Sequence, residues 1–286
     1  MANPGAWLVA QGRRQAWPVL ILLALGFAAP LLAVVGFSFT APKSFKILDG
    51  VTLENYATIF RETYYISFLW SLGFAALTVI LLAILCFPLA LGLVRVFGRW
   101  ANVVTLLFTI PLFVSENLRL YGWVLFLGKN GVLLGTLKNL FGIEAESILF
   151  EPPLIVFGMV YVYLPFMLFP MTLGLSMIPR QVMEAAYDLG ASRWQVFREV
   201  ELPLALPGVT IGALLTFVLG VGAIAEAKIL GGQSVIPITH DIEIAFTYMQ
   251  NWPLGAALSV LLMLVVGTLV LVVLRRFDLD RILGRR

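Results

Sequence analysis

Long apolar stretches of this sequence contain or adjoin a small set of charged residues: Glu116, Arg119, Glu226 and Lys228. A charge at the centre of a membrane helix costs about 2.5 to 3.5 kcal/mol on insertion scales, so each of these residues needs a partner or a role. Glu116 and Arg119 are three residues apart and share one face of a helix, where they either neutralise each other or line a polar path. Glu226 and Lys228 are two apart and do not face each other, so Glu226 either attracts a cation near the outer mouth of that path or contacts water and headgroups at the interface. These residues therefore suit the passage of a solute through the membrane.

Residue types that carry catalysis or hold metals are scarce. The chain has one histidine and one cysteine. His240 stands beside Asp241 and near Glu243, but without a second group of ligands this is weak evidence for a metal site. Cys86 lies in an apolar run, and a lone cysteine forms neither an internal disulfide nor a cysteine metal cluster. We therefore predict no catalytic residue, no metal ligand and no cofactor in this chain, and a membrane-embedded enzyme is the least supported of the functional hypotheses.

The composition indicates a membrane protein. Of 286 residues, 60% are hydrophobic and 12% are charged, with a mean hydropathy of +0.97, which is more than a soluble domain hides from water. Six apolar segments are long enough to cross roughly 30 Å of hydrocarbon, and lipid requires each to be a helix. We predict an all-α polytopic chain, one transmembrane domain over 1–286, with the first span uncleaved behind Arg13 and Arg14. The predicted spans are 17–39, 66–94, 102–127, 153–177, 205–230 and 254–274.

The basic residues divide unevenly between the two sides of the membrane. One set of loops and termini holds Arg13, Arg14, Arg95, Arg99, Arg180, Arg193, Arg198, Arg275, Arg276, Arg281, Arg285 and Arg286. The other holds Lys43, Lys46, Arg61, Lys129 and Lys138. The positive-inside rule therefore predicts that both termini are cytoplasmic. Because the bases are scattered between apolar blocks and form no single stripe, membrane lipid is an expected partner and nucleic acid is not.

The loop 178–204 is the longest polar-bearing stretch between the predicted spans. Pro179 suits the first turn of a short helix, and Gly190 suits the left-handed residue that ends it. Residues 192–195 have the Ser-x-x-Gln pattern that opens a second short helix, and Pro203 stops or bends the chain before the next span. The pattern predicts a helix, a glycine turn and a helix on the cytoplasmic side. This pair is either a knob that fits a groove on a cytoplasmic partner or a solvated loop on the membrane surface.

The same loop carries a longer pattern. Glu184-Ala185-Ala186 is followed after three residues by Gly190 and, nine residues later, by Val200-Glu201-Leu202-Pro203. This pattern resembles the EAA loop of bacterial ABC importer permeases, with valine where isoleucine is common. The resemblance implies the type I ABC importer permease fold and a coupling role for the loop, which in that family docks into a cleft of the ATPase subunit. The residues that it marks for coupling are Glu184, Ala185, Ala186, Gly190, Leu202 and Pro203.

Further segments are similar to the spermidine/putrescine branch of these permeases: 110–123, 230–232 and 251–259. This similarity implies a polyamine or a related organic cation as the solute, with an amino-acid-like or phosphonate compound as the alternative. Together with the charged residues it gives a predicted substrate path, which consists of Ser115, Glu116, Asn117, Arg119, Trp123 and Glu226.

The predicted function is that of a transmembrane permease subunit of an ATP-binding-cassette importer in the bacterial inner (plasma) membrane. The resemblance implies an ATPase subunit dimer that binds ATP and Mg, a second and related permease subunit, and an extracytoplasmic solute-binding protein. The phosphate loop Gly-x-x-x-x-Gly-Lys-Ser/Thr is absent, so the energy must come from outside this chain. The alternative is an ion-coupled secondary transporter, which requires titratable groups at the membrane midplane and inverted repeats. Glu116 gives slight support to that alternative, but the sequence shows no repeat.

Overall fold

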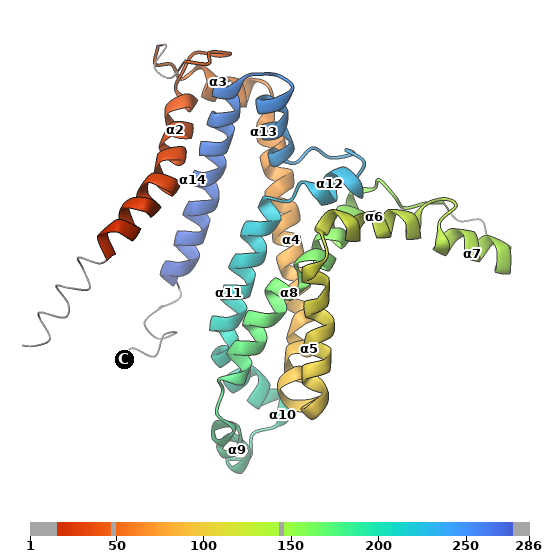
Figure 1. Cartoon of the computed structure of the whole chain (residues 1–286). Helices are drawn as coiled ribbons and strands as arrows, with labels where there is room; N and C mark the ends of the chain where they lie inside the picture. The colour runs from red at the N-terminus through yellow and green to blue at the C-terminus, as the bar shows by residue number, and fades with distance from the viewer. Residues whose placement is uncertain (1–15, 47–49, 143–145, 277–286) are drawn as a thin grey trace, which may run out of the picture. The chain divides into compact units, whose positions relative to one another are not determined.

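The computed structural model describes residues 16–46, 50–142 and 146–276 (Figure 1). Within these ranges the chain is helical or irregular, and no strand occurs. The prediction of an all-α membrane protein with six spanning helices is confirmed. A backbone in lipid must form its hydrogen bonds within its own segment, which explains why the spanning segments are helices. The helices long and apolar enough to cross a membrane are Ala16–Ser38, Tyr64–Val96, Glu116–Phe141, Pro152–Ser176, Arg193–Val221 and Trp252–Arg276.

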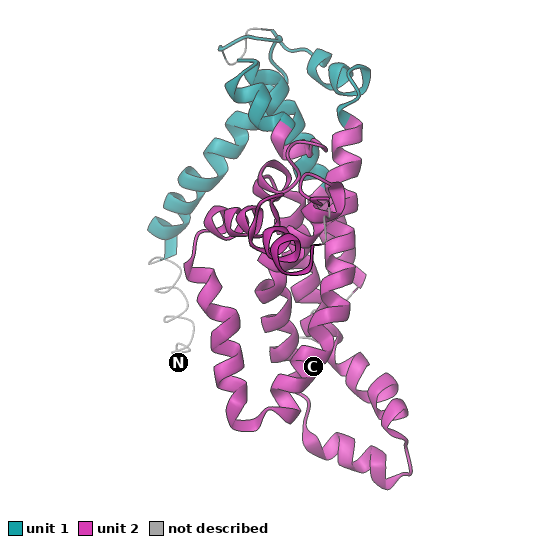
Figure 2. Cartoon of the chain, turned by 90° about the vertical axis from the view of Figure 1, so that its right-hand side faces the viewer, with its two compact units in different colours: residues 1–64, 241–265 teal, residues 65–240, 266–286 magenta. Residues whose placement is uncertain are grey.

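The sequence predicts one domain, whereas the described chain forms two compact units (Figure 2). Unit 1 contains residues 1–64 and 241–265, and unit 2 contains residues 65–240 and 266–286. The helices of unit 1, some of which continue into unit 2, are η1 (Ala24–Ala28), α2 (Ala29–Ser38), α3 (Glu54–Arg61), α13 (Ile238–Thr247) and α14 (Trp252–Arg276).

A buried polar contact in unit 1 fixes α3 to the end of α2. The amide of Asn55, which is 1% exposed, donates hydrogen bonds to the carbonyl oxygens of Ser38 and Thr40. The Tyr56 hydroxyl donates to the Ser38 hydroxyl. Carbonyl groups at the end of a helix have no partner within that helix, so these side chains satisfy them where the chain leaves α2.

Unit 2 is the larger unit and contains the loop and the charged residues that the sequence marks. Its first half runs through α4 (Tyr64–Leu91), η2 (Gly92–Val96), η3 (Gly98–Trp100), α5 (Ala101–Thr109), η4 (Ile110–Phe113), α6 (Glu116–Leu127) and α7 (Val132–Phe141). Its second half runs through α8 (Pro152–Ser176), α9 (Arg180–Asp188), α10 (Arg193–Gln195), η5 (Val196–Glu201), α11 (Leu202–Val221) and α12 (Ala225–Ile229).

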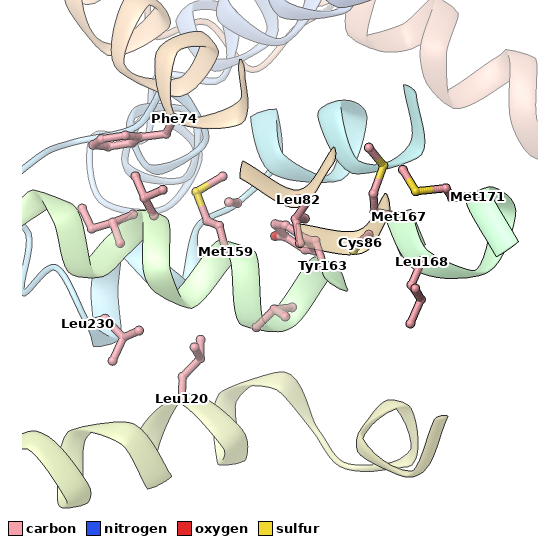
Figure 3. Close-up of a cluster of buried hydrophobic side chains, with 14 of the residues drawn as sticks. Phe74, Leu82, Cys86, Leu120, Met159, Tyr163, Met167, Leu168, Met171 and Leu230 are labelled. Carbon is pink, nitrogen blue, oxygen red and sulfur yellow. The ribbon is translucent and has the colours of Figure 1, made fainter. Parts of the chain in front are cut away.

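The core of unit 2 lies around α8 (Figure 3). This helix has apolar side chains on every face, so it is suited to burial on several sides at once. Met159, Met167 and Met171 of α8 are each at most 1% exposed. Leu82 of α4 and Leu120 of α6 are also fully buried in this cluster. The helix α8 is therefore the element on which the others of unit 2 pack.

Helices α8 and α11 lie side by side and approach closely through small residues (Figure 1). A Cβ atom added at Gly208 would lie 2.5 Å from the carbonyl oxygen of Pro170 and 2.9 Å from the Cα of Gly174. A Cβ atom at Gly212 would lie 2.9 Å from the carbonyl oxygen of Met167. Small residues that let two backbones touch are the usual basis of helix packing in membranes.

The predicted span 102–127 is not one helix. The helix that starts at Ala101 ends in the short 3-10 turn Ile110–Phe113, and α6 begins at Glu116. Between them, Val114 and Ser115 have extended ψ angles of 134° and 135°. Pro111 lies in the first turn of the 3-10 segment, where its missing N–H group leaves a helical carbonyl without its partner. A continuous helix over this segment was a wrong expectation.

The predicted fifth span also differs from the structure at both ends. The helix α11 ends at Val221, and residues 222–224 separate it from α12, so Glu226 does not belong to the same helix. At the other end Pro203 does not stop the chain: it occupies the first turn of α11, and helical structure runs through it from Arg193. The wide π turn η5 lies directly before this proline.

We expect Gly208→Val to destabilise unit 2, because its side chain would collide with the backbone of α8. Overpacking of this kind costs about 1–3 kcal/mol. The melting temperature of the purified chain in detergent should fall. Gly73→Val is the matched control, since a Cβ atom at Gly73 on α4 has no atom within 4 Å. Equal melting temperatures for the two variants would contradict the close α8–α11 contact.

Candidate functional site

The loop between α8 and α11 has the local structure that the sequence predicts. Helix α9 (Arg180–Asp188) begins after Pro179, which is its N-cap. Gly190 follows with a φ angle of +83°, in the left-handed region that strains any residue with a side chain. The Ser192 hydroxyl accepts a hydrogen bond from the Gln195 amide N–H, and the Gln195 side-chain oxygen accepts one from the Ser192 N–H. The predicted helix, glycine turn and capping box are confirmed.

This loop presents its side chains to the outside. Helix α9 has no buried residue. Leu189 is 88% exposed and Trp194 is 66% exposed. Large apolar side chains that stay this exposed in a well-formed turn are typical of a surface that another protein covers. Of the residues marked for coupling, the exposed ones are Glu184, Ala185, Gly190 and Pro203, and the half-buried ones are Ala186 and Leu202.

The structure brings together charged residues from separate parts of the chain. Glu116 and Arg119 lie on α6, Glu226 lies on α12, and α6 and α12 pack against each other. The electrostatic neighbours of the Glu226 carboxylate include Glu116, Arg119 and Tyr163 of α8. Glu226 is fully buried, and within the described residues the Tyr163 hydroxyl lies near its carboxylate without forming a hydrogen bond. These groups form one cluster with two carboxylates and one guanidinium.

Arg119 does not form an ion pair with Glu116 in the described part of the chain. Its Nε and Nη1 atoms are buried and have no hydrogen-bond partner there. Its guanidinium carbon lies 5.7 Å from the ring centroid of Tyr161. A cation within about 6 Å of an aromatic face is attracted to the ring, so Tyr161 is one of the groups that stabilise this charge, beside Glu116 and Glu226. Glu116 and Arg119 nevertheless interact electrostatically, so both readings left open by the sequence, mutual neutralisation and the lining of a polar path, stay predictions.

Two cavities lie on either side of Arg119. One has a volume of about 430 Å³ and the other about 310 Å³. Ser115 and Glu116 line the first, Trp123 lines the second, and Arg119 lines both. Asn117 is exposed and lines neither of these two. The larger cavity is lined by Leu112, Phe113, Val114, Ser115, Glu116, Arg119, Val162, Tyr163, Phe166 and Leu219.

Aromatic rings line the smaller cavity. Trp123 makes edge-to-face contacts with Phe126, Phe157 and Tyr161, at ring-centroid distances of 5.7, 4.7 and 5.6 Å. Such contacts fix the orientation of the indole ring. The predicted path residue Trp123 therefore has a defined position beside Arg119.

Sequence reasoning missed two features of this region. Tyr163 faces the larger cavity from α8, and Arg95 forms an ion pair with Glu201. Arg95 and Glu201 are 106 positions apart, so no local pattern could have paired them. The one available signal was that Glu201 is an acidic residue in the otherwise apolar segment 200–204.

A helical membrane chain with an exposed helix–glycine–helix loop between two closely packed spans has the features of a transporter permease. The family model described as "Binding-protein-dependent transport system inner membrane component" matches residues 89–281, and the chain belongs to this family. It is accordingly an inner-membrane permease subunit of an ABC importer, and the ion-coupled alternative is not supported.

Named relatives and solved structures agree with this class. The chain is 31% identical to the spermidine/putrescine transport system permease protein PotB of Escherichia coli strain K12, over 85% of this chain and 89% of that protein. It is 30% identical to PotB of Haemophilus influenzae, over 90% of each chain. The fold is similar to that of a bacterial ABC transporter that imports the acidic polysaccharide alginate, with a TM-score of 0.74 and 17% identity over 94% of this chain and 99% of the other. A further structure of a bacterial alginate ABC transporter, in complex with its pentasaccharide-bound periplasmic protein, matches with a TM-score of 0.73, 18% identity, and 93% and 92% coverage.

We expect Gly190→Val to loosen the turn after α9, because a β-branched residue in the left-handed region adds about 1–3 kcal/mol of strain. Hydrogen exchange of the amides of Gly190 and Ala191, which bond to Tyr187 and Ala186, should then speed up about tenfold or more. Gly190→Asn is the control, since asparagine tolerates this conformation. Unchanged exchange in the valine variant would show that the turn does not depend on glycine.

Proposed function

We propose that this permease assembles with a second, related permease and an ATPase dimer, and that it passes a polyamine or related organic cation delivered by an extracytoplasmic binding protein. ATP and Mg bind to the ATPase subunits, and both termini of this chain lie in the cytoplasm with the loop 178–204. The observation that carries the coupling part of the proposal is the exposed loop, which presents Glu184 and Leu189 between the end of α8 and the start of α11.

The loop is well placed to move two spans together. It follows α8 after Ser176, and its second helical part runs without a break through η5 into α11. Because α8 and α11 touch through glycine backbones, a push on the loop acts on both helices as one body. An ATPase subunit that binds the loop therefore changes the tilt of this helix pair when the nucleotide-bound ATPase dimer closes.

The cluster around Arg119 supports a cationic solute. Glu116 and Glu226 outnumber the one guanidinium that lies near them, so the cluster favours an added positive charge. Tyr161, Tyr163 and Trp123 supply aromatic faces and edges in the same region, and such faces bind ammonium groups. The relatives named for spermidine and putrescine support the same class of solute.

Co-purification tests the assembly. The tagged chain, extracted from its native cells in detergent, should retain an ATPase subunit that mass spectrometry identifies. Glu184→Lys should lose it, because the variant reverses the charge on the exposed loop. Glu199→Lys, an exposed glutamate of the same loop outside the marked positions, should retain it. If wild type holds no ATPase even after crosslinking, the proposed assembly is wrong.

Uptake of labelled spermidine and putrescine tests the solute. Glu226→Gln keeps the side-chain shape but removes the buried charge, and interactions with a charged group contribute about 1.5–3 kcal/mol, so uptake should fall about tenfold or more. Glu151→Gln, at an exposed glutamate that caps α8, should transport normally. If the Glu226 variant imports polyamines at the wild-type rate, the role of Glu226 in solute binding is wrong. If amino-acid-like or phosphonate compounds alone are imported, the polyamine assignment fails.

A further inference from the structure

An ion pair joins the loop to a third helix of unit 2. Arg95 donates a hydrogen bond from Nη1 to the Oε1 atom of Glu201. Arg95 lies in η2, at the end of α4, and Glu201 is the last residue of η5. The side chain of Glu201 is 7% exposed and that of Arg95 is 26% exposed. Glu201 is therefore a buried charge, and in the described chain Arg95 is its partner.

Both members of this pair lie in π-helical turns. Gly92–Val96 is a wide turn that ends the span beginning with α4, and Val196–Glu201 is a wide turn within the helical structure that runs into α11. Such turns are rare and occur frequently at functional sites, because the inserted residue can shift along the helix with little change elsewhere. The pair thus connects two points at which α4 and α11 can adjust their winding.

A second contact reinforces the first. Phe87 of α4 meets Phe197 of η5 edge to face, with ring centroids 5.5 Å apart. Phe197 is also stacked on the exposed Trp194, with ring centroids 5.2 Å apart. The loop therefore contacts the α4–η2 segment through one ion pair and one aromatic pair. The stacking of Phe197 on Trp194 extends the aromatic contact to the exposed surface of the loop.

Arg95 also interacts with the helix that carries the marked Glu-Ala-Ala residues. The side chain of Tyr187 on α9 lies near its guanidinium. Tyr187 follows directly after Ala186 in the sequence. Arg95 of η2 therefore lies near both helical parts of the loop, α9 and η5.

We infer that Arg95 and Glu201 are positioning residues that transmit the displacement of the loop to α4. This inference rests on the proposed coupling function of the loop. The loop is covalently continuous with α8 and α11, but α4 is connected to it only through side chains. Helix α4 also packs on α8 in the core. Without the pair, the end of α4 nearest the loop would follow the loop less closely, so ATP would be hydrolysed with less effective transport.

The test uses the complete importer in proteoliposomes with its solute-loaded binding protein. Arg95→Glu, Glu201→Arg and the double exchange are compared for ATPase retention, ATP hydrolysis and uptake. Each single variant should retain the ATPase and hydrolyse ATP within about twofold of wild type, while uptake falls about tenfold, because like charges then face each other. The double exchange should restore uptake to within about threefold of wild type, since it re-forms the pair with reversed charges.

Glu199→Arg is the matched control, because it makes the same change at an exposed position of the same π turn, and it should leave uptake unchanged. Wild-type uptake in the single variants, or no recovery in the double exchange, would overturn the inference. Loss of the ATPase from the single variants alone would also overturn it, since the pair would then belong to the docking surface. An ATPase missing from wild type would instead refute the proposed function itself.

If either single variant fails to accumulate as a monodisperse protein, Glu201→Gln takes its place. This variant keeps the shape of the side chain and removes its charge. A raised ratio of ATP hydrolysed to solute imported supports the link, and a wild-type ratio refutes it.

Discussion

Two helices in a lipid bilayer gain little from apolar contact alone, because lipid chains are as apolar as the side chains that would replace them. The contact of α8 with α11 solves this problem through backbone proximity at Gly174, Gly208 and Gly212. The rest of unit 2 depends on that contact. The core gathers around α8, and the exposed loop is the connection between the two helices. Any motion imposed on the loop is therefore imposed on a pair of helices that pack as one body.

The larger cavity lies where the spanning structure is interrupted. A backbone that leaves the helical conformation inside a membrane protein must find partners in protein or water, so such breaks occur next to polar cavities. Val114 and Ser115 form such a break, and both line the larger cavity. Glu116 begins the helix that follows, and the carboxylate at that end of a helix faces unpaired N–H groups. The break in the helix and the charged residue that follows it therefore line the same cavity.

Sequence alone was sufficient for the parts of the structure that depend on local chemistry. Hydropathy predicted the all-helical class, and Gly190 and Ser192 predicted a turn and a cap because each acts on its own backbone. The break at Val114 was missed, since an apolar residue carries no signal of the strain that Pro111 places on its neighbours. The association of Glu116 with Glu226 and of Arg95 with Glu201 was not predictable either, because each depends on how helices pack.

The charged residues of unit 2 differ in a way that separates their roles. Glu201 has its arginine, so its burial is compensated within the chain. The Glu226 oxygens and two nitrogen atoms of Arg119 are buried without hydrogen-bond partners in the described residues, a costly arrangement for charged groups in a low-dielectric interior. Glu226 lines neither of the two cavities around Arg119, but Tyr163, which lines the larger one, lies near its carboxylate. The Arg95–Glu201 pair suits a permanent link between helices, and the cluster of two carboxylates with one guanidinium supports the proposal of a cationic solute.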